Sequence, residues 1–203
     1  MLENKLGIKN SYDLAREEEK ITKLNAMELF DTKKIDEFEV GTFKGLSKIH
    51  EFLFHDIYSF AGKIRKENIA KGNFRFASSM YLEDVLNKID NMPEKTFPEI
   101  VKKYVEMNIA HPFREGNGRS TRIWLDMILK KQLKKVIDWS KINKEDYLLA
   151  MERSPIKDVE IMLLLKNALT SKINDRQVFM KGIDASYQYE GYSTYTMEEL
   201  DKE

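Results

Sequence analysis

Apolar side chains recur about every three or four residues along most of the chain, which is the spacing of one helix face. The clearest run consists of Phe43, Leu46, Ile49, Leu53 and Ile57. An earlier run begins near Ser11, which can act as a helix cap, and continues to about Phe30. The pattern predicts helices that bury one face each.

Capping residues and breakers mark the later helices. Thr96, Pro98 and Glu99 form a capping-box start for a helix that leads to His111. Further helices are predicted over about 79–92 and 119–135 and from Asn143, Ser154 and Asn174, the last closed by Gly182. The sequence thus predicts an all-α protein.

One segment departs from the helical pattern. Between Asn68 and Ala77, the pair Gly72-Asn73 separates short runs that contain Ile69 and Phe74. Such a pair between short apolar runs is typical of a β-hairpin. A connecting loop anchored by aromatic side chains is the alternative, and these residues alone do not decide between them.

Composition narrows the class of protein. The chain has 203 residues, 42% of them hydrophobic, which is enough to bury one core. Its 34 basic and 34 acidic residues balance, so we expect neither nucleic acid nor a membrane as a direct partner. The chain has no cysteine for a disulfide or a catalytic thiolate, and no apolar run of bilayer length. The polar start also lacks a signal-peptide core, which favours a cytoplasmic location.

Candidate chemistry is concentrated in residues 111–122, which read HPFREGNGRSTR. The proline after His111 discourages helix, and helical spacing resumes later, so a loop leads into a helix N-terminus. The amides of Gly116, Asn117 and Gly118 can converge there on phosphate oxygens, helped by the helix dipole. The segment is therefore suited to bind an anion.

Four side chains of this segment suit nucleotide chemistry. Arg119 and Arg122 share one helix face, so each can offer a guanidinium fork to phosphate oxygens. Glu115 is a hard ligand for a magnesium ion that keeps most of its waters. His111, with an ordinary pKa of about 6.5, can take a proton from a hydroxyl. Each residue alone has an ordinary structural explanation, and their combination in this order favours a polyphosphate site.

The segment resembles the Fic motif His-x-Phe-x-(Asp/Glu)-Gly-Asn-Gly-Arg-x-x-Arg at every specified position. The resemblance implies an all-α Fic-fold helical bundle with a small β-hairpin flap over the active site. It implies transfer of AMP from ATP to a protein hydroxyl, with His111 as general base and Glu115 as ligand of Mg²⁺ or Mn²⁺. Arg119 and Arg122 would bind the β- and γ-phosphates. Doc kinases have lysine at the second glycine, so Gly118 argues against that variant.

The resemblance also gives expectations for the flap, residues 68–77. A Fic flap lies over the nucleotide and holds the target segment extended. Its target-docking residues would be Phe74, Arg75 and Phe76. Lys71 is expected to approach a phosphate, and Asn108 to face the nucleotide from one turn before His111. For Asn108, an amide on the helix surface is an equal alternative.

A second pattern lies near the C-terminus, where Ser186 and Glu190 share one face of a short helix stopped by Gly191. It resembles the inhibitory motif (Ser/Thr)-x-x-x-Glu-(Gly/Asn) of Fic proteins. Glu190 would then pair with Arg122 and remove the fork that the γ-phosphate needs. Without the catalytic motif, an amphipathic tail would be the simpler interpretation. After relief, an accessible hydroxyl such as that of Tyr187 is a candidate for self-modification.

These patterns predict an N-terminal helical extension over 1–25, a Fic catalytic domain over 26–182, an inhibitory helix over 183–192 and a polar tail over 193–203. Two alternatives to AMP transfer stay open. They are transfer of another phosphate-linked group, such as phosphocholine or the γ-phosphate, and nucleotide-dependent regulation without catalysis. By resemblance alone, an ATPase subunit of a type II topoisomerase is a candidate target. Self-association is a candidate way to tune the inhibition.

Overall fold

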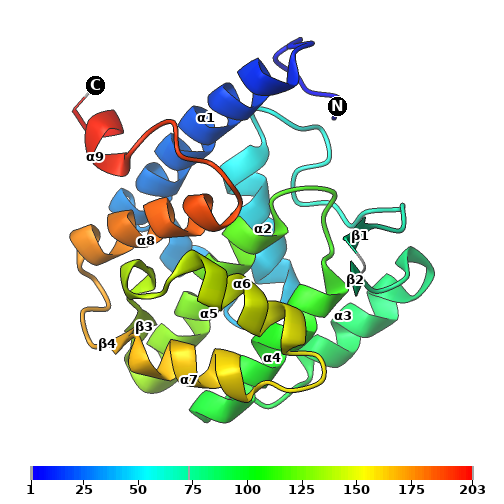
Figure 1. Cartoon of the computed structure of the whole chain (residues 1–203), viewed down its shortest axis with the longest axis vertical. Coiled ribbons are helices and arrows are strands. Elements are labelled where there is room, and N and C mark those ends of the chain that lie inside the picture. The colour runs from blue at the N-terminus through cyan, green and yellow to red at the C-terminus, as the bar shows by residue number, and fades with distance from the viewer. Residues whose placement is uncertain (1, 73, 203) are drawn as a thin grey trace.

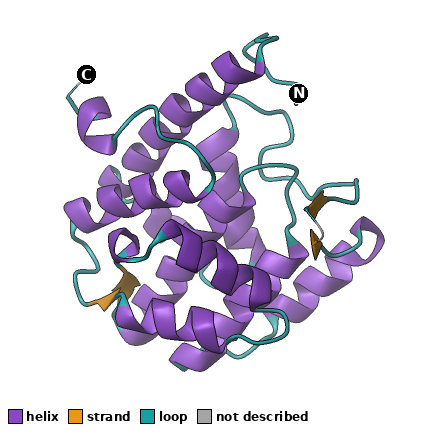
Figure 2. Ribbon diagram, viewed as in Figure 1, coloured by secondary structure: helices purple, strands orange, loops and turns teal. Residues whose placement is uncertain are grey.

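The computed structural model of the chain describes residues 2–72 and 74–202. Within these ranges the protein is predominantly helical with two small antiparallel strand pairs, as the all-α prediction requires (Figure 1, Figure 2). The helices are α1 (Ser11–Asp31), α2 (Phe43–Phe54), α3 (Leu82–Asp90), α4 (Phe97–Ala110), α5 (Asn117–Leu133), α6 (Lys144–Arg153), α7 (Val159–Asn167), α8 (Arg176–Tyr189) and α9 (Met197–Leu200). Single 3-10 turns occupy Lys34–Glu37, Ser79–Tyr81 and Trp139–Lys141. Among the described helices, none is both long and apolar enough to span a membrane.

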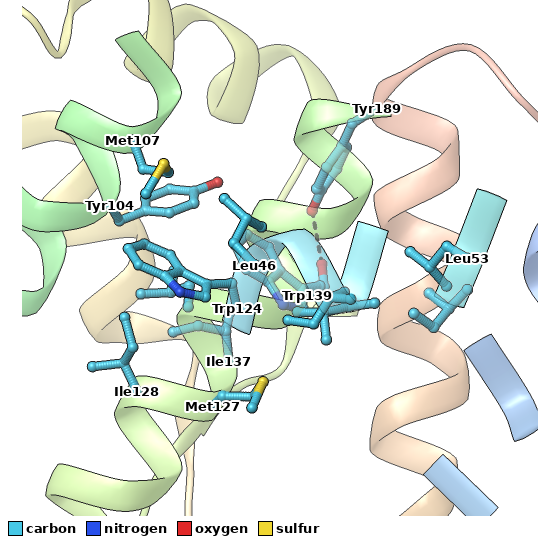
Figure 3. Packing of buried hydrophobic residues seen from close by; sticks show 14 of the residues in the cluster. Leu46, Leu53, Tyr104, Met107, Trp124, Met127, Ile128, Ile137, Trp139 and Tyr189 are labelled. Atoms are coloured by element: carbon cyan, nitrogen blue, oxygen red, sulfur yellow. Dashed lines mark hydrogen bonds between the residues drawn. The ribbon is translucent and has the colours of Figure 1, made fainter. Parts of the chain in front are cut away.

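Helices α4 and α5 position the motif loop between them. The predicted capping box starts α4, because Thr96 and Glu99 each accept a hydrogen bond from the main-chain amide of the other. α5 packs against α2, α4 and α8, and its Trp124 is fully buried beside Tyr104 and Leu46 (Figure 3). The motif loop is thus mounted on the centre of the hydrophobic core.

The predicted hairpin is present. Strand β1 (Ala70–Lys71) pairs antiparallel with β2 (Phe74–Arg75), which decides against the plain loop. Asn73, at the predicted turn, lies outside the described residues. A second pair, β3 (Val136–Ile137) with β4 (Leu169–Thr170), joins the segments after α5 and α7 and had no clear sequence pattern.

Three predicted helix signals are wrong. Ser154 does not start a helix but ends α6, and α7 begins only at Val159, after Asp158. Asn10 rather than Ser11 caps α1, since its side chain accepts hydrogen bonds from the next turn. Gly182 does not close a helix but lies inside α8, where a Cβ would come within 3.3 Å of the Trp139 ring. Close packing therefore explains this glycine, and Gly191, with φ of 92°, is the left-handed residue after the helix.

The two ends of the chain belong to the same packed unit. α1 runs through the predicted boundary at residue 25 and contacts α2, α8 and α9. Its Lys23 is buried and lies 2.9 Å from Asp184 of α8. The predicted polar tail contains α9, whose Met197 and Leu200 are buried. Helical extension and tail are therefore parts of the bundle, because both contribute apolar side chains to it.

Candidate active site

The loop between α4 and α5 is fixed by its own residues. Gly116 has φ of 76°, and a Cβ there would lie 2.4 Å from the Phe54 ring, so conformation and space both favour glycine. The buried side chain of Asn117 accepts from the amide of Phe113 at 2.8 Å and donates to its carbonyl at 2.7 Å. These contacts hold the N-terminus of α5, where helix amides favour an anion.

A carboxylate lies at this helix end. A Cβ on Gly118 would be 2.1 Å from Oε1 of Glu190, so the missing side chain gives that carboxylate room. Arg122 Nη2 donates to Oε1 of Glu190 at 2.7 Å, and Nζ of Lys71 lies 3.7 Å from Oε2. Burial raises the pKa of Glu190, but Arg122 and Lys71 outweigh it and lower the pKa to about 2. The carboxylate is therefore an anion bound to two predicted phosphate ligands.

Arg122 is held from two helices. Ser186 of α8 accepts from Nε at 2.7 Å with its hydroxyl and from Nη2 at 2.9 Å with its carbonyl. Tyr147 of α6 accepts from Nη1 at 3.1 Å, and the guanidinium carbon lies 5.4 and 5.3 Å from the ring centres of Tyr147 and Tyr189, which stack on each other. The Tyr189 hydroxyl in turn donates to the Trp139 carbonyl at 2.9 Å, which fixes the end of α8 (Figure 3). Ser186 and Glu190 thus both contact Arg122, and the pairing with Glu190 is the one expected from the sequence.

Arg119 has a different environment from the expected open fork. Its side chain is 1% exposed, and Nη1 lies 2.7 Å from Oε1 of Glu18 in α1. Nη2 donates to Oε1 of Glu115 at 3.1 Å. The rings of Phe54, Tyr187 and Tyr192 lie within 5.3 Å of the guanidinium carbon. In this conformation Arg119, the predicted β-phosphate ligand, is therefore already paired with two carboxylates.

Glu18 itself is tied to two tyrosines. It accepts from the Tyr58 hydroxyl and, at 2.8 Å, from the Tyr192 hydroxyl. Burial raises its pKa, but the charge of Arg119 and these hydrogen bonds outweigh burial and lower the pKa below its ordinary value, so Glu18 is ionised. Sequence reasoning missed this residue because it lies about a hundred positions before its partner.

His111 has the geometry of a proton acceptor. It ends α4 with φ of 48°, and its Nδ1 lies 3.2 Å from the Asn108 carbonyl. Donation from Nδ1 to this carbonyl leaves Nε2 as the acceptor. The ring of Phe76 on the flap stacks on the imidazole at 3.7 Å. Burial lowers the pKa of His111 to about 4, so the ring is neutral at neutral pH.

Asn108 contacts His111 through its main chain, and its side chain is half-buried. On the flap, Phe74 and Phe76 are half-buried with their rings 5.0 Å apart, whereas Arg75 is exposed. Phe76 therefore faces the base, while Arg75 is available to solvent.

Glu115 is the one motif carboxylate, and 43% of its side chain is exposed. Its Oε1 accepts from the amide of Gly116 at 2.9 Å as well as from Arg119. Within the described residues, no three His, Cys, Asp or Glu side chains gather as metal ligands. A single hard oxygen ligand fits a magnesium ion whose other ligands are phosphates and waters.

His50 supports the motif through a hydrogen bond to its main chain. It is buried, its Nε2 lies 2.8 Å from the Glu115 carbonyl, and Gly62 donates to its Nδ1 at 2.9 Å. Burial lowers the pKa of His50 to about 3, so it is a neutral hydrogen-bonding group. No pattern in the sequence connects His50 with the motif, because only the fold brings the two together.

Tyr187 is not the accessible hydroxyl that the sequence suggested. Its side chain is 1% exposed, and its hydroxyl donates to Thr22 Oγ1 at 2.6 Å. The expectation failed because α8 packs Tyr187 against α1 and Arg119. In this conformation Tyr187 cannot accept a group from a nucleotide.

Comparison with known proteins identifies the family of this chain. The Fic/DOC family profile matches residues 42–129, which contain α2, the flap, α4 and the motif. The chain belongs to the Fic/DOC family. Protein adenylyltransferase VbhT of Bartonella schoenbuchensis is 31% identical over 89% of this chain and 40% of that protein. Probable protein adenylyltransferase Fic of Salmonella typhimurium is 29% identical over 63% of this chain and 67% of that protein.

Solved structures show the same Fic fold. BepC from Bartonella tribocorum, determined with bound AMPPNP, matches with a TM-score of 0.67 at 20% identity, over 84% of this chain and 92% of that one. The N-terminal Fic domain of Bep8 from Bartonella sp. 1-1C matches with a TM-score of 0.71 at 17% identity, over 85% and 92%. This Fic chain spans about two fifths of the length of VbhT. The family profile covers neither α1 nor α8, which supply Glu18 and Ser186.

Proposed function

We propose that this Fic protein transfers AMP from ATP to a hydroxyl of a target protein, and that the end of α8 restrains the reaction. The observation that carries the proposal is the Glu190 carboxylate bound to Arg122 at the N-terminus of α5. An anion there marks the place suited to phosphate. The relatives named as protein adenylyltransferases, and BepC with its bound AMPPNP, support ATP as the substrate.

In the proposed reaction the target hydroxyl attacks the α-phosphorus of ATP. Nε2 of His111 takes the hydroxyl proton as the new O–P bond forms and the bond to pyrophosphate breaks. The amides of Gly116, Asn117 and Gly118 receive the charge that develops on the leaving pyrophosphate. A Mg²⁺ or Mn²⁺ ion held by Glu115 would neutralise phosphate charge when bound.

The two arginines have separate parts in this proposal. Arg122 holds the γ-phosphate once Glu190 has left, since the same fork cannot serve both anions. Arg119 stays paired with Glu18 and Glu115 and would contribute positive charge beside the β-phosphate. Lys71 loses the same inhibitory partner as Arg122 and becomes a phosphate ligand on the flap.

The flap presents the target in this proposal. Strand β2 carries Phe74 and exposed Arg75, and strand pairing with an extended target segment would align a hydroxyl without demanding much sequence. Phe76 limits how close that segment comes, because its ring already covers one face of His111.

The test is transfer by the full chain with Glu190→Gly, incubated with α-labelled ATP and magnesium in a bacterial lysate. We expect labelled proteins that carry AMP by mass spectrometry, and a loss of about 10²- to 10⁴-fold when His111→Ala is added. ATP binding by the double variant should persist. A phosphate or phosphocholine adduct would identify another transfer, and ATP binding without any adduct would indicate a regulatory module.

A further inference from the structure

Arg65 is a buried arginine outside the motif that joins three parts of the site. Its side chain is 2% exposed. Its guanidinium donates to four main-chain carbonyls, those of Glu67, Ala77, Ala110 and His111, at 2.6, 2.6, 3.1 and 2.7 Å. Its main-chain amide donates to the Pro112 carbonyl at 2.8 Å. Arg65 therefore bonds to both ends of the flap and to the start of the motif.

Two of these carbonyls lie at the C-terminus of α4. The last carbonyls of a helix lack intrahelical partners, and the dipole places partial negative charge on them. Glycine in a left-handed conformation commonly ends a helix at such a point. Here the left-handed residue is His111, with φ of 48°, a conformation that is strained for a residue other than glycine. A cation that binds the Ala110 and His111 carbonyls stabilises this strained ending.

The other two carbonyls flank the flap. Glu67 precedes it and Ala77 closes it, so one planar group fixes the distance between its ends. The Ala77 amide also donates to the Ile109 carbonyl at 3.0 Å, and the Phe76 ring lies on His111. The flap is thus attached to α4 at the position of the base.

The chemistry of the side chain suits this task. Arginine presents five N–H donors in a rigid plane, whereas lysine offers one compact charge. Burial lowers the pKa of Arg65 and the Glu67 charge opposes this shift, but an arginine stays protonated at neutral pH. The burial of the Arg65 guanidinium is explained by the positions in which it holds the four carbonyls.

We propose that Arg65 is a positioning residue of the transfer reaction, holding the flap at the distance from Nε2 of His111 that brings a target hydroxyl to the base. The inference rests on the proposed AMP transfer. A hydroxyl misplaced by about 1 Å can lose 10²-fold in rate. Water that hydrolyses ATP at the same site needs no flap, so hydrolysis depends less on Arg65.

The test compares Arg65→Lys with Arg153→Lys, an exposed arginine on α6, both in the full-length Glu190→Gly chain. For each protein we would measure ATP affinity by calorimetry, release of AMP to water, and AMP transfer to the lysate proteins that the parent labels. We expect Arg65→Lys to lower transfer about 10²-fold, to lower hydrolysis distinctly less, and to leave ATP affinity unchanged. Arg153→Lys should leave all three as in the parent.

The outcomes separate the two proposals. If the parent transfers no AMP, the proposed function fails and this inference fails with it. If the parent transfers AMP and Arg65→Lys loses transfer and hydrolysis in equal proportion, or loses neither, only the positioning role is overturned.

An unaltered chain provides a second measurement if Arg65→Lys does not fold. The amides of Arg65 and Ala77 donate to the Pro112 and Ile109 carbonyls, one on the motif and one at the end of α4. If Arg65 locks flap and motif together, both amides should exchange with solvent through one common opening. Unrelated opening free energies would overturn the inference.

Discussion

Arg119 and Arg122 stand three residues apart on α5, are both buried, and each pairs with a carboxylate at 2.7 Å. The carboxylates differ in where they are anchored. Glu18 lies inside α1 and is 3% exposed, whereas Glu190 follows the last residue of α8 and is 23% exposed. Removing Glu18 requires α1 to leave the bundle, but removing Glu190 requires only the last turn of α8 to open.

The two arginine–carboxylate pairs therefore have the same chemistry but differ in how firmly their carboxylates are anchored. The Arg119 pair is part of the folded structure, with Tyr58 and Tyr192 completing the hydrogen bonds of Glu18. In the Arg122 pair, Glu190 lies just beyond the last residue of α8 and beside Gly191. Under the proposed function, the restraint on Arg122 can be released while Arg119 keeps its partner, and the following changes test this contrast.

The largest effect is expected for Glu18→Ala. It leaves the Arg119 guanidinium buried without its main carboxylate, and breaking a buried pair costs about 3–5 kcal/mol. Glu17→Ala, an exposed neighbour in the same helix, is the matched control. Urea denaturation measures both. Equal losses of unfolding free energy would show that the Arg119 pair is not structural.

The pH dependence of the Glu190 pair comes next. Its pKa of about 2 lies below the ordinary 4.5, a difference worth on the order of 3 kcal/mol. Because the folded-state pKa is depressed, this stability is present above pH 4.5 and is lost as the pH falls towards about 2. The unfolding free energies of wild type and Glu190→Gln should therefore differ at neutral pH and converge in acid. A difference independent of pH would contradict the ion pair.

Activity should respond to the same pair. If it is worth roughly 2–3 kcal/mol, Glu190→Gly raises AMP transfer about 30- to 150-fold, and adding Arg122→Ala cancels the gain. Gln188→Gly, an exposed position in the last turn of α8, controls for the weakening of the helix by glycine. Initial rates at matched ATP and magnesium decide the question. An equal gain from Gln188→Gly would assign the restraint to the helix and not to the carboxylate.

The smallest effect is expected for Tyr192→Phe, which removes one hydrogen bond to Glu18. A hydrogen bond to a charged group is worth about 1.5–2 kcal/mol in such a site. Tyr12→Phe, at an exposed tyrosine of α1, should change nothing. Thermal denaturation of the two variants gives the comparison, and indistinguishable midpoints would mean that Tyr192 does not support the Arg119 pair.

The same contrast shows what the sequence could reveal. The motif, the flap and the Ser186–Glu190 spacing were predictable because their residues are close neighbours in the chain. The contacts of Glu18 and Arg65 were not, because they depend on how α1 and the flap pack against α4 and α5. Tyr187 was misjudged for the same reason, since a tyrosine on a terminal helix looks exposed until its packing partners are known.

Under the proposed function, Gly118 has a consequence for the mutations that could release the restraint in a living cell. A methyl group there would push Glu190 aside, but it would also stand where the nucleotide must approach α5. Lineages selected for constitutive activity should therefore carry their changes in α8, at Ser186 or Glu190, and not in the glycine loop. Many substitutions at Ser186 or Glu190 could remove the restraint, whereas a substitution at Gly118 would remove it only by also obstructing the nucleotide.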